Sequence, residues 1–199
     1  MKTWEDITLS DYYKLQDKID GLTGADLDLS VVSFLNNIPE DTLRHMNHCD
    51  YQKLLRDSDL GEFTYNTDNC PKKVTIGNRK YRVDTHIAKW STQQYMDFSI
   101  LWTTQNFRQD YGHILACLLI PIKAKGYGVD YDVDAEAEFL YNNCNIVLAN
   151  QLCFFFMIFL HNLQVILTHY SLRKARKMKA PADLMDKLQA QITRLGGLR

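Results

Sequence analysis

The sequence lacks the short motifs that mark the commonest nucleotide-binding, esterase and metalloprotease sites. Its 199 residues contain no Gly-x-x-x-x-Gly-Lys loop, no Gly-x-Gly-x-x-Gly turn, no Gly-x-Ser-x-Gly elbow and no His-Glu-x-x-His helix. Each motif supplies a geometry that its chemistry requires, such as backbone amides around a phosphate or two histidines on one helix face. Their absence favours a protein that is not an enzyme and that needs no cofactor.

Cysteine, glycine and proline are scarce as well. The five cysteines are an odd number and form no Cys-x-x-Cys pair, so neither a disulfide framework nor a zinc ribbon is indicated and a reducing compartment fits best. Nine glycines and four prolines are too few for a disordered or fibrous chain. A secretory signal is missing too, because residues 1–6 are charged and carry no apolar stretch, and we therefore expect a cytoplasmic protein.

Long hydrophobic runs are also absent. The longest, residues 152–160, has nine residues, whereas a helix that crosses a bilayer needs about 20. Polar residues interrupt both of its ends, including Asn150, Gln151 and His161. The run therefore predicts a buried helix and no membrane partner.

What remains is the composition of an ordinary globular domain, with 46% hydrophobic and 24% charged residues. We predict an α+β fold that is mainly α-helical, with one globular domain over residues 1–172 and a basic, peripheral helical tail over residues 173–199. Apolar spacing and capping residues predict one helix over residues 10–19, two or three short helices within residues 27–57, and one helix that opens at Ser91. Three further helices are predicted over residues 111–122, 135–143 and 146–172.

A small antiparallel β-hairpin or sheet is expected around residues 63–84. Residues 74–76 and 79–83 carry β-branched or alternating side chains, and Gly77-Asn78 between them suits a tight hairpin turn.

Aromatic side chains crowd the long helix on all sides, so a single buried stripe cannot hold them all. We expect part of this surface to bind another protein. The candidate partner-binding residues are Phe154, Phe155, Phe156 and Phe159, with Tyr95 and Trp102 from the helix that opens at Ser91.

Two clusters resemble chemical sites. His45, His48 and Cys49 lie close in sequence, but no second ligand pair follows at zinc-site spacing, which favours a surface helix face.

Asp130, Asp132 and Asp134 resemble the start of a calcium loop, yet Ala135 and Tyr141 stand where such a loop requires Gly and Glu. Capping of the next helix explains the triplet more simply. The alternative is a small metal-dependent hydrolase or nucleic-acid-processing enzyme that uses these aspartates with a histidine such as His113.

The C-terminal tail is basic. Residues 170–199 hold eight Lys and Arg against Asp183 and Asp186, a net charge of +6, which leaves −7 for the rest of the chain. Candidate anion-binding residues are Arg173, Lys174, Arg176, Lys177 and Lys179. A solvated helix is the simplest interpretation, and a nucleic-acid-binding module with non-specific DNA contact is the other.

Three stretches resemble a set of proteins from tailed bacteriophages, especially phages of Bacteroidetes, described as tail assembly chaperones or virion-associated proteins. They are Trp4-Glu5-Asp6-Ile7-Thr8-Leu9 with Tyr12; Tyr81-Arg82-Val83 followed by Gln94-Tyr95-Met96-Asp97; and residues 115–121, with Tyr127 and Tyr131-Asp132-Val133 after them. The basic tail departs from the pattern of this set.

The resemblance implies a non-enzymatic assembly or virion structural protein of the tail or portal region that acts through protein–protein contacts. Its expected partners are other phage structural or assembly proteins and further copies of itself. Its expected location is the host cytoplasm during assembly, or the finished virion.

Overall fold

The computed structural model describes residues 2–58, 70–104, 107–157, 171–172, 184, 186–190 and 193. The chain divides into two compact units, Met1–Leu152 and Cys153–Arg199. The domain boundary that the sequence predicts at Leu172 stays a prediction, because residues 173–183 directly after it lie outside the described part. The mainly helical α+β fold is confirmed.

The first unit opens with the 3-10 helix η1 (Trp4–Asp6) and the helix α1 (Leu9–Ile19). The Thr8 side chain caps α1 by accepting a hydrogen bond from the backbone N–H of Asp11 at 3.1 Å, so the helix begins one residue before the predicted start at Ser10. Around this cap, Leu9 and Ile146 form backbone hydrogen bonds with Cys144 and Ile7, which attaches the start of the unit to its C-terminal part.

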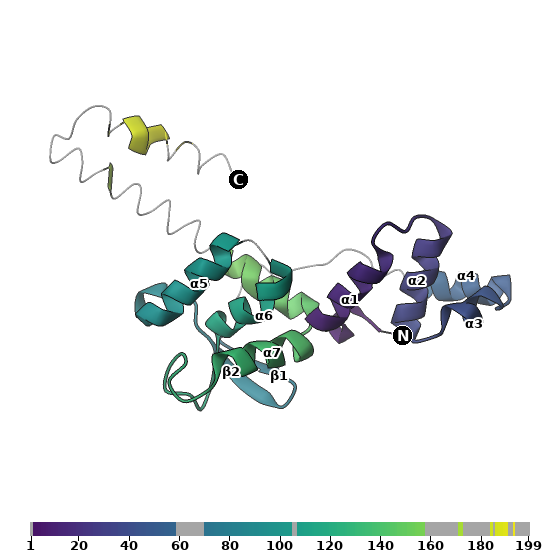
Figure 1. Cartoon of the computed structure of the whole chain (residues 1–199), viewed down its shortest axis with the longest axis horizontal. Helices are drawn as coiled ribbons and strands as arrows, with labels where there is room; N and C mark the ends of the chain where they lie inside the picture. The colour runs from purple at the N-terminus through teal and green to yellow at the C-terminus, as the bar shows by residue number, and fades with distance from the viewer. Residues whose placement is uncertain are drawn as a thin grey trace. The chain divides into compact units, whose positions relative to one another are not determined.

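Three helices follow, α2 (Ala25–Asn36), α3 (Glu40–Arg44) and α4 (His48–Asp57), within the region where two or three short helices were expected. Asn37 ends α2 in the left-handed conformation, and the Asn47 side chain caps α4. The three helices share a small core of Leu29, Val32 and Leu43 with the partly buried Ile38, Met46, Tyr51, Leu54 and Leu55. Figure 1 shows them grouped beside α1.

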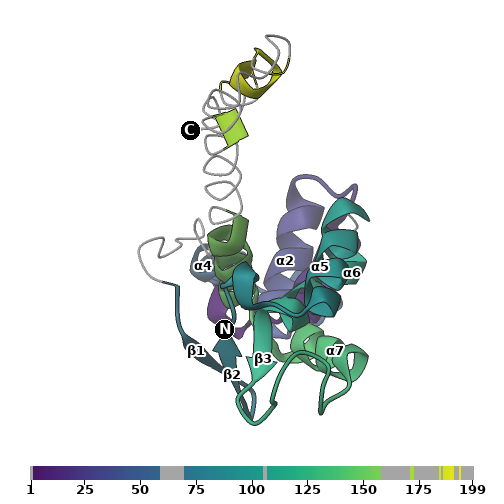
Figure 2. The same ribbon diagram turned by 90° about the vertical axis from the view of Figure 1, so that its left-hand side faces the viewer.

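The sheet has three antiparallel strands in the order β1 (Lys73–Ile76), β2 (Arg79–Val83) and β3 (Leu119–Pro121), drawn side by side in Figure 2. The hairpin of β1 and β2 is confirmed, with Gly77 at a positive φ of 55° in its turn. The stretch 63–69 of the expected sheet lies outside the described residues.

The third strand corrects the helix that was predicted over residues 111–122. The helix α6 (Phe107–Leu118) ends four residues earlier, and β3 then pairs with β2, so that Tyr81 lies opposite Pro121 and Val83 opposite Leu119. Residues 114–120 are all at most 1% exposed. A continuous apolar run suits a buried strand as well as a buried helix, so periodicity alone could not separate the two.

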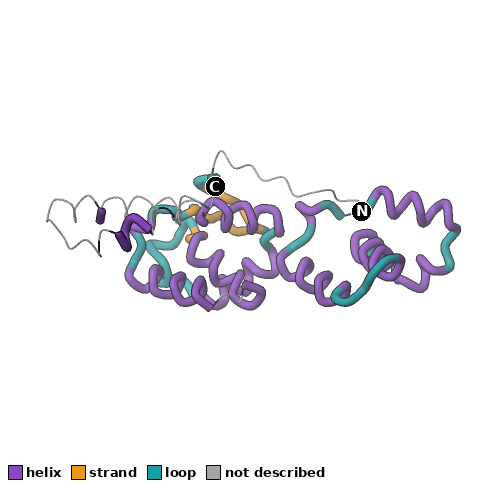
Figure 3. Tube along the Cα trace, turned by 90° about the horizontal axis from the view of Figure 1, so that it is seen from above, coloured by secondary structure: helices purple, strands orange, loops and turns teal. Residues whose placement is uncertain are grey.

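The remaining elements of the first unit are the 3-10 helix η2 (Ile87–Lys89), α5 (Thr92–Thr104) and α7 (Val133–Asn143). The predicted cap of α5 is confirmed, because the Ser91 hydroxyl accepts a hydrogen bond from the backbone N–H of Gln94 at 3.1 Å. The helix α6 packs against both α5 and α7, and α7 also packs against α1. The strands lie among these helices in Figure 3.

The predicted long helix over residues 146–172 is described only in part. Residues 146–152 of the first unit are helical, as are residues 153–157 and 171–172 of the second, while 158–170 lie outside the described residues. Within the described part of the chain, no helix has the length and hydropathy that crossing a bilayer would require.

The helices α6 and α7 come unusually close at Gly112. A Cβ atom added there would lie 2.4 Å from the carbonyl oxygen of Ala137, which no real Cβ tolerates. Only glycine therefore lets the backbone of α6 lie against that of α7.

We expect Gly112→Ala to lower the free energy of unfolding by about 1–3 kcal/mol, because the two helices must separate to admit the methyl group. The loss should appear even though alanine is favoured over glycine in a helix by about 1 kcal/mol. Chemical denaturation followed by circular dichroism measures it. A more stable variant would show that the close approach is no constraint.

A buried carboxylate joins α7 to the sheet. Glu136 is 6% exposed and accepts hydrogen bonds from the Tyr81 hydroxyl and, at 2.8 Å, from Arg79 Nη1. The Arg79 guanidinium also lies 3.8 Å from the centre of the Phe139 ring. Burial, followed by the hydrogen bond to Glu136, raises the pKa of Tyr81, so its hydroxyl remains a donor.

Glu136→Ala is expected to lower the free energy of unfolding by about 2–3 kcal/mol, because the buried Tyr81 hydroxyl loses its acceptor and Arg79 its ion pair. The exposed Glu138 on the same helix supplies the matched control, and Glu138→Ala should change stability by less than about 0.5 kcal/mol. Urea denaturation of both variants makes the comparison. Equal losses would assign the effect to helix α7 in general.

Candidate functional site

The first candidate site is a groove of about 260 Å³ in the first unit, which we call the α5–α7 groove. It is bordered by α5, α6, the start of α7 and the segment that follows β3. Its lining residues are Asp97, Ile100, Leu101, His113, Tyr127, Val133 and Asp134. Leucine, isoleucine and valine therefore share this space with two carboxylates, a phenol and an imidazole.

A chain of polar contacts holds one wall of the groove. The Asp97 carboxylate accepts hydrogen bonds from Gln93 Nε2 at 2.6 Å and from the Tyr127 hydroxyl at 3.1 Å. The Tyr127 oxygen also lies 3.6 Å from the Cys117 sulfur. Burial is the main cause that raises the pKa of Tyr127, and the nearby Cys117 adds to it. Tyr127 therefore stays a neutral donor that orients Asp97.

A second contact in the lining of the groove brings together two residues of the enzyme alternative. His113 on α6 lies with Nε2 3.2 Å from Asp134 Oδ1 at the start of α7. The side chains of the other two aspartates accept hydrogen bonds from the backbone. Asp132 caps α7 by accepting hydrogen bonds from the N–H groups of Asp134 and Ala135, and Asp130 accepts one from the N–H of Lys125. The capping interpretation of Asp132 is confirmed, and the hydrolase alternative stays a prediction.

Large apolar side chains are exposed on the elements that border the groove. Tyr95, Met96 and Ile100 on α5 are 54%, 51% and 58% exposed. Ile122 and Val129, from the segment after β3, are exposed as well. Among the described residues of Met1–Leu152, these five are all the large hydrophobic side chains classed as exposed. The other predicted contact on α5, Trp102, is half-buried and stacks on Phe98 with ring centres 5.6 Å apart.

The aromatic residues of the second unit differ in exposure. Phe154 is 40% exposed, Phe155 is intermediate and Phe156 is 1% exposed, while Phe159 lies outside the described residues. Of the three described phenylalanines, Phe154 offers the most surface. The five basic residues that were predicted to bind anions, from Arg173 to Lys179, also lie outside the described residues.

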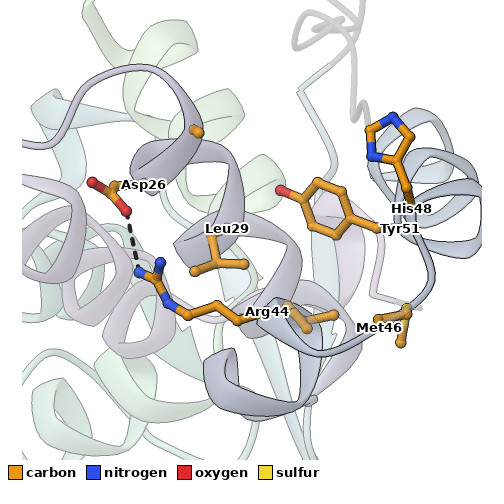
Figure 4. A pocket seen from close by; sticks show the side chains of 8 residues that line it. Asp26, Leu29, Arg44, Met46, His48 and Tyr51 are labelled. Carbon is orange, nitrogen blue, oxygen red and sulfur yellow. Dashed lines mark hydrogen bonds and ion pairs between the residues drawn. The ribbon is translucent and has the colours of Figure 1, made fainter.

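A second pocket, of about 240 Å³, lies among α2, α3 and α4 (Figure 4). At one end Arg44 Nη2 lies 3.1 Å from Asp26 Oδ1, and Leu29 points into the space beside this ion pair. The ring of Tyr51 extends from α4 toward α2 at the other end. Burial, followed by the charge of Asp28, raises the pKa of Tyr51. This pocket therefore combines apolar side chains with an ion pair, a histidine and a tyrosine.

The histidine and cysteine cluster of the sequence falls beside this second pocket. His48 lines it, whereas His45 Nδ1 lies 2.7 Å from the Asp41 carbonyl and the backbone N–H of Cys49 donates to the Asn47 side chain. Over the described residues, no three His, Cys, Asp or Glu side chains are grouped so that they could hold a metal ion.

The thiol beside the α5–α7 groove is not a nucleophile at neutral pH. Cys117 is fully buried, and its burial raises the pKa of the thiol to about 12. The thiolate is the reactive form of cysteine, so its chemistry is suppressed here. The Cys117 side chain acts as a small apolar group, and the backbone carbonyl of Cys117 accepts a hydrogen bond from Gln94 Nε2 at 2.8 Å.

Iodoacetamide should therefore modify the exposed Cys49 in the folded protein and leave the buried Cys117 and Cys144 unmodified at pH 7 and pH 9. Both pH values lie below the pKa of Cys117, so little of its thiol becomes thiolate in this interval. Peptide mass spectrometry before and after unfolding in urea measures the labelling. Equal rates at Cys49 and Cys117 in the folded protein would contradict the burial.

Comparison of the chain with protein-family models, with curated proteins and with solved structures gave no match. The sequence named Tyr95, Asp134 and His113 as site candidates, whereas Asp97 appeared only within a stretch of the family resemblance and Ile100 was not named. Asp97 follows Gln93 at the helical spacing of four, a weak signal that would not have been recognised without the fold.

Proposed function

We propose that this chain is a non-enzymatic bacteriophage protein that acts in assembly or in the virion through protein–protein contacts. The observation that carries the proposal is the exposed row of Tyr95, Met96 and Ile100 on α5, beside the α5–α7 groove. The phage setting comes from the sequence resemblance, in which Tyr95 and Met96 belong to one of the similar stretches.

The exposed row supports a contact surface for a physical reason. Burying apolar surface gains about 25 cal/mol per Å², so side chains of this size are stabilised when a partner covers them. Scattered single exposures are common, but apolar side chains gathered around one groove mark interaction sites more often. Here the exposed large hydrophobic residues described in the first unit all come from two neighbouring segments.

The size of the pockets favours a protein partner over a small molecule. Pockets for drug-sized ligands and cofactors usually have about 300–1,000 Å³ and enclose most of the ligand. The two pockets described here have about 260 and 240 Å³, which suits one or two side chains of another protein. Protein interfaces commonly combine an apolar centre with a polar rim.

Within this proposal, the chain either shields a partner before assembly as a tail assembly chaperone or becomes a component of the tail or portal region. Mass spectrometry of purified particles and of assembly intermediates separates the two roles. Presence in mature virions supports the structural role, and presence only in intermediates supports the chaperone. Absence from both would contradict the proposal.

We expect Ile100→Glu to lower the amount of the chain in these particles or intermediates about tenfold, because it places a charge in the apolar row. Gln16→Glu, at an exposed position of α1, adds the same charge outside the row and should leave the amount unchanged. Quantitative mass spectrometry of both variants measures the effect. Circular dichroism should show equal folding, since Ile100 is mostly exposed.

A further inference from the structure

The α5–α7 groove combines apolar and acidic side chains. Its apolar members are Ile100, Leu101 and Val133, and its acidic members are Asp97 and Asp134. The side chain of Asp134 is 89% exposed, so most of its carboxylate surface is accessible to a partner. The adjoining stretch of residues 126–134 holds three aspartates and no lysine or arginine. A ligand that complements this groove carries positive charge next to apolar side chains.

The chain itself contains a segment of that chemistry. Residues 1–152 hold 15 Lys and Arg against 22 Asp and Glu, a net charge of −7, whereas residues 153–199 carry +6. Five of the basic residues fall between Arg173 and Lys179, and Leu184 and Leu188 follow at helical spacing. Leu184 is 44% exposed. The opposite charges of the two parts of the sequence provide electrostatic complementarity between copies.

We propose that the α5–α7 groove binds the basic segment, residues 173–199, of a second copy of the chain. Leucine side chains of the segment cover Ile100 and Val133, and its lysines and arginines approach Asp97 and Asp134. The proposal rests on the proposed function in one respect only, which is that assembly brings many copies together.

This contact has a definite geometric consequence. The groove of one copy meets a different surface of the next copy, so the interface is heterologous. An open assembly therefore keeps a free groove at one end and a free basic segment at the other, and association continues beyond a dimer unless the arrangement closes into a ring. Because much of the attraction is between exposed charges, salt should weaken it.

The test uses the full-length protein in sedimentation velocity. The groove variant carries Ile100→Ser and Asp134→Lys, and the tail variant carries glutamine at Arg173, Lys174, Arg176, Lys177 and Lys179. The natural protein is expected to form oligomers larger than dimers at about 0.05 M salt, and to dissociate at about 0.5 M salt, where screening is several times shorter in range. Each variant alone should self-associate at least about tenfold more weakly.

Mixing the two variants gives the sharpest outcome. The groove variant retains an intact basic segment and the tail variant an intact groove, so an equimolar mixture should form a dimer of one copy of each and stop there. Asp57→Lys, at an exposed position of α4, makes the same charge change as Asp134→Lys outside the groove and should self-associate like the natural protein.

A monomeric natural protein at low salt would overturn the proposal, and so would full self-association of either variant or a mixture that stays monomeric. These results are independent of the particle experiment, because a chain found in virions could still be monomeric in solution. Matching melting curves for all variants exclude unfolding as the cause of lost association.

Discussion

The close approach of α6 and α7 at Gly112 is the constraint on which the arrangement of the first unit depends. With no Cβ at this position, the backbone of α6 lies against the Ala137 carbonyl, and a larger residue would hold the two helices apart. The neighbouring His113 consequently lies beside Asp134 at the start of α7. One glycine therefore determines how the walls of the α5–α7 groove face each other.

The same helix α7 is attached to the sheet through a buried charge. Glu136 receives hydrogen bonds from Arg79 and Tyr81 on β2, and a carboxylate removed from water needs such donors. Tyr81 is fully buried and lies opposite Pro121 of β3, so the contact links α7 to the centre of the sheet. Packing against α6 and this polar contact with β2 fix α7 from two sides.

The α5–α7 groove combines a rigid polar wall with an exposed apolar border. Tyr127 and Gln93 hold the Asp97 carboxylate through hydrogen bonds, and the buried Cys117 closes the space behind Tyr127. Ile100 and Met96 remain exposed on α5 because no described element of the unit covers them. A surface with fixed charges and uncovered apolar side chains is well suited to contacts between proteins.

Local signals predicted much of the fold. Ser91 caps the helix that was predicted to open there, and Gly77 lies in the turn of the predicted hairpin, since capping and turn formation depend on residues only a few positions apart. The strand β3 was missed because all of its residues are apolar, a pattern that fits a buried helix as well as a buried strand. The segment is a strand because it pairs with the edge of β2 that β1 leaves free. Asp97 and Ile100 were missed because a groove exists only where distant segments meet.

The sequence by itself determined the mainly helical α+β class, the positions of the helix caps, the hairpin and the opposite charges of the two ends of the chain. These properties depend on composition and on short-range hydrogen bonds. Only the tertiary structure decided that His113 meets Asp134, that Glu136 is buried beneath Arg79 and Tyr81, and that Phe156 is buried while Ile100 is exposed. Those outcomes depend on packing between residues 20 to 60 positions apart, which local patterns do not encode.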